Sequence, residues 1–406
     1  MKDGITPAFL ARIPKTDLHV HLDGSLRIST LIELAKEAKV DLPSYEESGL
    51  RERVFKENYN DLPEYLAGFA YTCAVMQTPE NVERVAYEIA IDNLEENVRY
   101  LEVRFGPQLH IREGFTMREV LLAVHRGLNR AKQEHNLKAE VQSGADLPFE
   151  YGIIVCALRW FNPHMSSYYH DLFHVMKYAR PKTIFATASL ELARASVALR
   201  DREGLPIVGF DLAGAESGNP AGDHEEAFQY AHRNFIKKTV HAGEAYGPES
   251  IFQALTDCHA NRIGHGTFLF AAERIVSPHV KDHELYVEQL VNYIASQRIS
   301  VEVNLTSNLQ TLPEIEDVAS HPLRLMMEHG LSASICTDNR LVSNTTVTRE
   351  LALACEHLPI DRKRLRNLIV AGFKGSFFPG SYTEKRRFVR QAINFYESIE
   401  REMLDA

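Results

Sequence analysis

The chain has 406 residues, of which 45% are hydrophobic and 25% are charged, a composition typical of a globular protein with a large core. Its formal net charge of −10 argues against a nucleic-acid backbone or an anionic membrane surface as the main binding partner. The N-terminus lacks the apolar core of a signal peptide, and no apolar stretch approaches the length of a membrane span, so we expect a cytoplasmic protein. The 5 cysteines show no C-x-x-C spacing, which predicts buried, reduced thiols.

Along the chain, short β-forming runs alternate with segments in which apolar residues recur at helical spacing. Leu31, Leu34 and Ala38 show this spacing in the first helical segment. We expect an opening strand around 19–21, with further strands at 99–105, 151–160, 207–211, 238–241, 262–265, 299–303 and 332–337. The main helices are expected at 26–39, 79–97, 116–135, 170–178, 188–201, 223–235, 249–260, 283–296 and 322–329, and from about 348 to the C-terminus.

The passage between the first two strands is less regular. Residues 43–49 are polar and interrupted by Pro and Gly, which indicates a loop. Asp61 then predicts a helix N-cap, and the segment 65–75 that follows is rich in aromatic residues. This segment packs in the core or covers a pocket as an apolar lid, and the sequence leaves open whether the lid residues are Tyr65, Leu66 and Phe69.

Eight strands that alternate with helices indicate a parallel sheet, because parallel strands need long crossover connections. We therefore predict an α/β fold of the (β/α)₈ TIM-barrel type, with additional helices inserted after the first strand and at the C-terminus. A doubly wound open sheet is the competing fold, but no Gly-rich phosphate motif follows the first strand. Residues 140–143 are an alternative strand to the better candidate at 151–160. With no repeat and no linker, we expect residues 1–406 to form a single domain.

Residues able to bind metal or transfer protons lie at the ends of four expected strands. His19 and His21 are two residues apart, so in extended backbone both imidazoles face the same side. His241, His265 and Asp338 follow the fifth, sixth and eighth strands. Each residue alone could be a hydrogen-bonded polar group at the rim of a barrel, but side chains at these strand ends converge. Imidazoles with a carboxylate suit zinc, which leaves room for water.

Glu244 lies three residues beyond His241, in the loop after the same strand. Zinc depresses the pKa of its bound water from ~16 to about 7, and the reaction then needs a group that delivers a proton to the substrate. A glutamate in a loop often caps a helix or lies on the surface. Beside a metal ligand, we favour a general acid–base role for Glu244.

These residues fall in blocks that resemble the signatures of the adenosine deaminase family. The blocks are His19–Gly24, Asp211–Gly214, His241–Glu244, Gly264–Gly266 and Thr337–Asn339. Their order and spacing match the family from about residue 13 to residue 375. The first block is shared by many metal-dependent amidohydrolases, whereas the third and fourth are far more specific. The resemblance implies a zinc-dependent (β/α)₈ barrel that converts adenosine-type nucleosides to the 6-oxo product and ammonia, a reaction of purine salvage.

The resemblance also implies a role for each residue of the predicted centre. One Zn²⁺ per chain would be held by His19, His21, His241 and Asp338. Glu244 would donate a proton to N1 of the purine, which makes C6 electrophilic. His265 and Asp338 would orient the attacking water and stabilise the tetrahedral intermediate.

On the substrate side, the family resemblance implies contacts with both the sugar and the base. Asp23 would accept a hydrogen bond from a ribose hydroxyl, and the backbone N–H of Gly214 would meet purine N3. His21 would also lie at the substrate. The residue after the metal-binding aspartate is usually a second aspartate that contacts N7, but here it is Asn339. An amide N–H can donate to N7 without a protonated acid, so purine binding is retained while the exact substrate stays open.

Alternative functions follow from the same residues. The chain could be a member of this family that acts on another 6-aminopurine, such as adenine, a modified nucleoside or an N6-substituted AMP. It could also be a non-catalytic binding protein on the same scaffold. A nucleotide would need Arg or Lys to hold its phosphate, and Lys15, Arg27 and Arg159 form no evident cluster, so we predict a small-molecule nucleoside as partner. The long passage between His265 and Asp338 could form an interface or a pocket wall, and the oligomeric state stays open.

Overall fold

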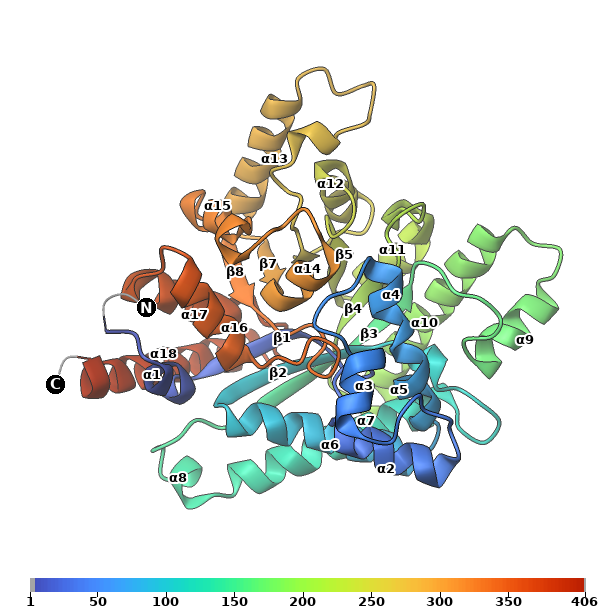
Figure 1. Ribbon diagram of the computed structural model, residues 1–406, viewed down its shortest axis with the longest axis horizontal. Helices are drawn as coiled ribbons and strands as arrows, with labels where there is room; N and C mark the ends of the chain where they lie inside the picture. The colour runs from blue at the N-terminus through green and yellow to red at the C-terminus, as the bar shows by residue number, and fades with distance from the viewer. Residues whose placement is uncertain (1–3, 405–406) are drawn as a thin grey trace.

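The computed structural model describes residues 4–404, and its central feature is a sheet of 8 parallel strands (Figure 1). Each strand pairs with the next one in the chain, from β1 to β8. A parallel bridge between Val20 of β1 and Asp338, just after β8, brings the two edges of the sheet together. The strands are β1 (Lys15–His21), β2 (Val98–Phe105), β3 (Glu150–Leu158), β4 (Ile207–Ala213), β5 (Lys237–Ala242), β6 (Arg262–His265), β7 (Ser300–Val303) and β8 (Ser332–Ile335). The predicted (β/α)₈ barrel is thus confirmed.

Helices surround this barrel and connect its strands (Figure 1). Those before β4 are α1 (Pro7–Arg12), α2 (Ile28–Ala38), α3 (Glu47–Arg53), α4 (Leu62–Ala67), α5 (Phe69–Val75), α6 (Pro79–Glu95), α7 (Met117–Asn136), α8 (Ala139–Gln142), α9 (Ser167–Val175) and α10 (Pro181–Glu203). The later ones are α11 (Glu225–Arg233), α12 (Pro248–Thr256), α13 (His283–Gln297), α14 (Leu305–Thr311), α15 (Leu323–Glu328), α16 (Val347–His357), α17 (Arg362–Gly375) and α18 (Tyr382–Leu404). Helices α2 to α5 between β1 and β2, and α16 to α18 after β8, confirm the predicted additions. The 3₁₀ helices are η1 (Pro107–Leu109), η2 (Ala221–His224), η3 (Ala272–Arg274) and η4 (Val318–Ser320).

The differences from the sequence prediction lie in short or capped elements. Residues 139–142 form α8, closed by a hydrogen bond from Ser143 N to Ala139 O of 2.9 Å, so the alternative strand at 140–143 is wrong. Helices α1, α3 and α14 were not predicted because six or seven residues are too few to show a periodic pattern. Helix α10 begins at Pro181, which fixes a helical φ at its start, rather than at 188. Asp61 caps α4 as predicted, since its side chain accepts from Glu64 N.

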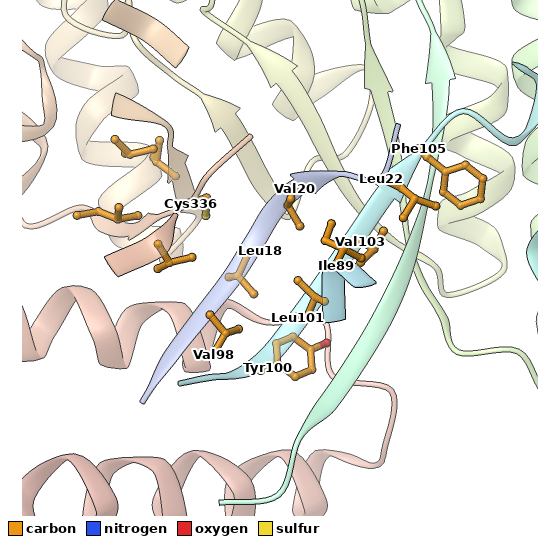
Figure 2. Packing of buried hydrophobic residues seen from close by; sticks show 14 of the residues in the cluster. Leu18, Val20, Leu22, Ile89, Val98, Tyr100, Leu101, Val103, Phe105 and Cys336 are labelled. Atoms are coloured by element: carbon orange, nitrogen blue, oxygen red, sulfur yellow. The ribbon is translucent and has the colours of Figure 1, made fainter. Parts of the chain in front are cut away.

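Side chains alternate between the two faces of the barrel wall. Figure 2 shows apolar side chains of β1 and β2, including Leu18, Val20 and Leu101, with Ile89 of α6 beside them. Residues at the intervening positions, such as His19 and Arg104, are polar, and Arg104 of β2 contacts Glu302 of β7 across the barrel. Because side chains two apart share a face, the apolar core lies between the barrel and its helices while the barrel interior is polar. This polar interior is the floor of the candidate site.

Two further expectations can be compared with the structure. All five cysteines are buried and free, as predicted. Within residues 4–404, no helix is both long enough and apolar enough to cross a membrane.

Candidate active site

A cavity of about 1400 Å³ opens at the C-terminal ends of the strands. Its lining includes most of the residues that the sequence singled out, namely His21, Asp23, Gly214, His241, Glu244, His265, Asp338 and Asn339. His19 lies below this surface and is fully buried. Tyr65, Leu66 and Phe69 also line the cavity, so α4 and the start of α5 form part of its wall.

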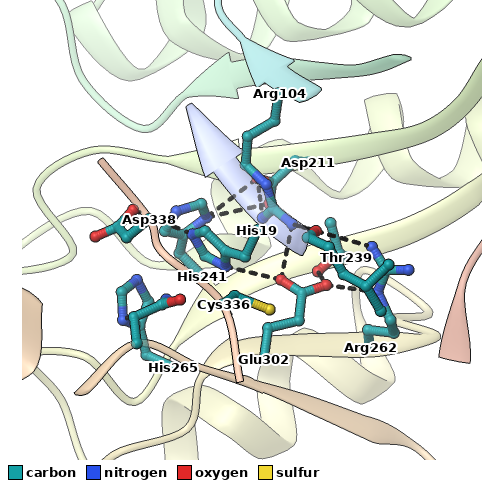
Figure 3. Close-up of polar contacts among 12 residues, drawn as sticks. His19, Arg104, Asp211, Thr239, His241, Arg262, His265, Glu302, Cys336 and Asp338 are labelled. Atoms are coloured by element: carbon teal, nitrogen blue, oxygen red, sulfur yellow. Dashed lines mark hydrogen bonds and ion pairs between the residues drawn. The ribbon is translucent and has the colours of Figure 1, made fainter. Parts of the chain in front are cut away.

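The imidazoles and one carboxylate meet at the bottom of this cavity (Figure 3). Ligand atoms of His19, His241, His265 and Asp338 all lie within 4.8 Å of one another. His19 Nε2 is 3.3 Å from Asp338 Oδ1, and His21 Nε2 is 3.1 Å from His241 Nε2 and 3.5 Å from Asp338 Oδ1. The structure therefore brings together residues from β1, β5, β6 and the end of β8 that are far apart in sequence.

Carboxylates behind two of the histidines determine which ring nitrogen faces the cluster. Glu302 Oε2 lies 2.8 Å from His19 Nδ1, and Asp211 Oδ1 lies 3.2 Å from His241 Nδ1 (Figure 3). Both carboxylates are ionised, because arginine and histidine neighbours hold their pKa values well below the usual range despite the opposing effect of burial. Ionised carboxylates only accept, so each Nδ1 carries a hydrogen and each Nε2 is the ring nitrogen that faces the cluster.

His265 has the opposite tautomer, fixed by a chain of hydrogen bonds. The backbone N–H of Leu323 donates to His321 Nδ1 at 3.1 Å, so the hydrogen of this imidazole is on Nε2. His321 Nε2 lies 3.2 Å from Asn308 Oδ1, and Asn308 Nδ2 lies 3.1 Å from His265 Nδ1. Burial keeps both imidazoles neutral by lowering their pKa values, that of His321 to about 3. His265 therefore presents an N–H donor to the cavity, and the hydrogen on its ring is on the opposite nitrogen from the Nδ1 hydrogens of His19 and His241.

A buried network of charges supports the cluster from below. Glu302 accepts from Arg104 Nη2 at 2.8 Å, from Arg262 Nε at 2.5 Å and from Thr239 Oγ1 at 2.9 Å (Figure 3). Arg104 also donates to Asp211 at 2.8 Å. The four charged side chains are fully or almost fully buried, and each charge has a partner, as low dielectric requires. Sequence analysis did not identify Glu302, Arg104 or Arg262, although a charged residue inside an apolar strand such as β7 is a recognisable signal.

The backbone is strained at two of the predicted site residues. His265 and Asp338 have φ values of 64° and 61°, in the left-handed region that non-glycine residues rarely adopt. Asp338 N donates to His19 O at 2.7 Å, and His21 N donates to Asp338 O at 2.7 Å. Ser307 Oγ donates to Asp338 Oδ2 at 2.6 Å, which leaves Oδ1 facing the histidines. This backbone pairing with β1 fixes the Asp338 carboxylate within the cluster.

Glu244 lies in a loop that a second glutamate organises. Glu216 accepts from the backbone N–H groups of Gly243, Ala245 and Tyr246 at 3.1, 2.7 and 3.0 Å, which places Glu244 between them. The Glu244 side chain is buried in the cavity wall, and its Oε1 lies 3.6 Å from His265 Nε2. Burial raises the pKa of this carboxyl to about 8, so it can hold a proton at neutral pH.

Asn339 is oriented by groups on both of its sides. Its Nδ2 donates to Tyr65 Oη at 2.9 Å, and this hydroxyl lies 2.8 Å from Ser343 Oγ. Its Oδ1 lies over Gly24, where a Cβ would come within 1.8 Å, so only glycine fits there. One amide hydrogen is left for a ligand in the cavity. The sequence did not predict a polar role for Tyr65.

The last two predicted residues, Asp23 and Gly214, also line the cavity. The Asp23 carboxyl is buried, and burial raises its pKa to about 7. Gly214 adopts a φ of 94°, which places its backbone at the cavity wall without a side chain. No residue between 266 and 337 lines the cavity, so the long passage after His265 is not a pocket wall. Instead it supplies Glu302, Ser307, Asn308 and His321 from behind.

The fold and the cluster together define a (β/α)₈-barrel protein with a candidate metal centre. A family model described as "Adenosine deaminase" matches residues 14–188 and 175–394. The chain is 32% identical to adenosine deaminase of Mycobacterium avium over 386 residues, 95% of each chain. It is also 33% identical to a Dictyostelium discoideum protein named "Probable adenosine deaminase", over 97% of this chain and 44% of that longer one. This chain belongs to the adenosine deaminase family, and it is accordingly a hydrolase of the purine deaminase type.

Solved structures of similar shape span almost the whole chain. The Arabidopsis N6-mAMP deaminase is 25% identical, with a TM-score of 0.72 over 96% of this chain and 99% of that one. A Burkholderia ambifaria amidohydrolase with bound zinc has a TM-score of 0.76 at 18% identity, over 100% of this chain and 98% of that one. Adenine deaminase of Arthrobacter aurescens has a TM-score of 0.72 at 20% identity, over 95% of this chain and 99% of that one. The last two show a shared fold alone.

Proposed function

We propose that this protein hydrolyses adenosine and 2′-deoxyadenosine to the 6-oxo nucleoside and ammonia, with one bound zinc ion. The observation that carries the proposal is the arrangement within one cavity. The Nε2 atoms of His19 and His241 face the Asp338 carboxylate, and the buried acid Glu244 lies beside them. The family membership and the curated relatives named adenosine deaminase support the same reaction.

The residues of the cluster fit a divalent cation. His19 Nε2 is buried and has no hydrogen-bond partner among residues 4–404, and His21 Nε2 and His241 Nε2 face each other at 3.1 Å. Imidazole nitrogens and a carboxylate gathered this closely form a donor set that one divalent cation can bind. We assign His19, His21, His241 and Asp338 as the ligands. His265 is excluded because its Nε2 carries a hydrogen. When bound, zinc would lower the pKa of water from 15.7 to about 7 and so supply a nucleophile at neutral pH.

The chain's own groups then act on the purine from two sides. Glu244 holds a proton where it can be donated to N1, which withdraws electrons from the ring and makes C6 electrophilic. The Nε2–H of His265 and the Asp338 carboxylate orient the water that adds to C6. The same N–H donor faces the oxygen that gains negative charge as the tetrahedral intermediate forms. The proton of the added hydroxyl then passes to the amino group, ammonia leaves as the C6 carbonyl forms, and Glu244 regains from solvent the proton that the attacking water had released.

The charge of the cavity favours a nucleoside over a nucleotide. Among the described residues that line it there is no Lys or Arg, whereas Asp23 and Asp171 are acidic. Arg159 donates instead to the backbone oxygens of Asn219 and His241, and Lys15 donates to carbonyls at the end of α1. A 5′-phosphate would thus meet carboxylates without a cationic partner. Although the Arabidopsis N6-mAMP deaminase has the same fold, this cavity lacks the chemistry for its phosphate.

The test of this proposal is a substrate panel on the purified protein: adenosine, deoxyadenosine, adenine, AMP and N6-methyl-AMP, followed by ammonia release. We expect kcat/KM for adenosine to exceed that for AMP at least about 100-fold, since an unpaired phosphate beside carboxylates costs several kcal/mol. A preference for AMP or N6-methyl-AMP would refute the assignment to nucleosides. Absence of ammonia from every compound would refute deamination.

Removal of one ligand should remove both the metal and the activity. We expect Asp338→Ala to lower zinc content well below one per chain and turnover by more than about 1,000-fold, because free water keeps its pKa near 15.7. Elemental analysis and the ammonia assay would be run together, with Asp171→Ala as the matched exposed carboxylate. Full activity of a zinc-free D338A protein would contradict the ligand assignment.

The Tyr65 hydroxyl should contribute to recognition of N7 through Asn339. We expect Tyr65→Phe to reduce the preference for adenosine over 7-deazaadenosine, which lacks N7, by about 2- to 10-fold, the value of one hydrogen bond. Tyr59→Phe is the matched control, because this ring packs against Tyr65 at 5.1 Å but its hydroxyl does not contact Asn339. An unchanged preference in Y65F would show that Tyr65 does not position the amide.

A further inference from the structure

A second group of metal-binding side chains lies beside the cavity, apart from the histidine cluster. Asp23 follows β1, Cys73 belongs to α5 and His110 follows η1 at the end of β2. Their ligand atoms all lie within 4.8 Å of one another, and all three residues are buried. Asp23 and Cys73 line the cavity, so a small ion can reach the group from the substrate side.

Two of these three side chains each have a buried polar atom without a hydrogen-bond partner among residues 4–404. His110 Nδ1 lies 3.0 Å from the carbonyl oxygen of Met76, which only accepts, so Nδ1 carries the hydrogen. His110 Nε2 consequently presents a lone pair, and it has no partner among residues 4–404. The same is true of Asp23 Oδ1. A buried acceptor that lacks a donor is costly, and here two residues with such acceptors lie beside a thiol.

The nucleoside assigned above accounts for only part of this arrangement. One ribose hydroxyl has a single hydrogen to donate, so it can satisfy Asp23 or His110 but not both. The Cys73 thiol would also be left without a role. A cation satisfies all three groups at once, because each can supply an electron pair to it.

We propose that Asp23, Cys73 and His110 form a second metal site that takes a soft divalent ion of the Zn²⁺ or Cd²⁺ type. Thiolate, imidazole and carboxylate together select such ions over Mg²⁺ or Ca²⁺. Bond lengths of about 2.0–2.3 Å in a tetrahedral site place ligand atoms roughly 3.3–3.7 Å apart. Ligand atoms at the 4.8 Å limit would therefore have to move about 1 Å closer together to bind one ion. Binding forms a metal–sulfur bond and releases the thiol proton of Cys73 to solvent.

Occupation of this second metal site should affect catalysis. This consequence rests on the proposed function. The ion takes the Asp23 carboxylate that we assign to the sugar, so it competes with the nucleoside. Excess metal should raise KM for adenosine by about tenfold or more and leave kcat nearly unchanged. Metal binding itself is independent of the deaminase activity and is measured without a substrate.

The test is a titration of the zinc-loaded protein with CdCl₂, with native mass spectrometry to count ions and ultraviolet absorption to detect sulfur-to-cadmium charge transfer. The assigned zinc ligands contain no sulfur, so this band reports on a thiol, and its loss in Cys73→Ala would assign it to the second site rather than to Cys156, which also lines the cavity. We expect one additional Cd²⁺ and a thiolate band in the wild-type protein. In Cys73→Ala we expect loss of the band and at least about a 100-fold weaker additional ion, since loss of even a supporting residue weakens metal sites by 10- to 100-fold.

Two further variants complete the experiment. Cys258→Ala removes another buried thiol that does not line the cavity, and it should retain both signals. His110→Gln should weaken the additional ion while the thiol is still present, which keeps the test valid if C73A does not fold. The proposal is overturned if the wild type takes up no additional ion, or if C73A and H110Q bind it as tightly as the wild type does. A KM that excess metal leaves unchanged, with the ion bound, would overturn the competition alone.

Discussion

Replacement of Glu244 by Gln should lower kcat for adenosine by about 100- to 10,000-fold, the usual contribution of a positioned general acid. The amide has nearly the same shape as the acid and still occupies the loop that Glu216 holds, but it cannot give a proton to N1. Since Glu244 is not among the assigned zinc ligands, we expect zinc content to stay near one per chain. Steady-state kinetics and elemental analysis on the same preparation test both statements.

The control for this prediction is another carboxylate of the same cavity. Glu113 lies at its exposed edge, and Glu113→Gln should change kcat by no more than about twofold. If E244Q turned over adenosine within tenfold of the wild type, Glu244 would not be the proton donor. Loss of zinc from E244Q would instead show that this residue maintains the metal centre.

Glu302→Ala should be the most destabilising single change in the site, costing about 3–5 kcal/mol of unfolding free energy. The substitution removes one of the two buried carboxylates that pair with each of Arg104 and Arg262, and it removes the acceptor of His19 Nδ1. Zinc affinity should fall by about 10- to 100-fold as well, because the His19 ring loses its orientation. Denaturant unfolding and a zinc competition assay measure the two effects.

An exposed ion pair provides the comparison. Glu314 contacts Arg274 at 2.7 Å on the surface, and Glu314→Ala should cost at most about 1 kcal/mol with no effect on zinc. Equal unfolding free energies for E302A and E314A would mean that the buried network does not stabilise the barrel interior.

The fold could be predicted from the sequence because each strand is a short run of β-formers followed by a helical pattern. The candidate site could be located because its residues lie at the ends of those strands, where barrel topology makes them converge. His241 and Asp338 are almost a hundred residues apart, and only the (β/α)₈ arrangement relates their positions. The short helices α1, α3 and α14 could not be predicted because their existence depends on packing and caps rather than on periodicity.

The supporting residues could not be predicted, for a different reason. Whether Glu302 contacts His19 depends on register and on the diameter of the barrel, which no local pattern encodes. The tautomer of His265 depends on a chain through Asn308 and His321 that ends at a backbone N–H. The same holds for Tyr65, whose hydroxyl contacts Asn339 from a helix far away in sequence. Spacing identified the candidate reactive groups, and three-dimensional contacts determine how each one is oriented.

The most direct measurement is a crystal structure of the zinc-loaded protein with bound inosine, with anomalous data collected at the zinc edge. The account predicts an anomalous peak held by His19, His21, His241 and Asp338, and the Glu244 carboxyl within hydrogen-bond distance of purine N1. A peak held by other residues, or a Glu244 side chain turned away from the base, would contradict it.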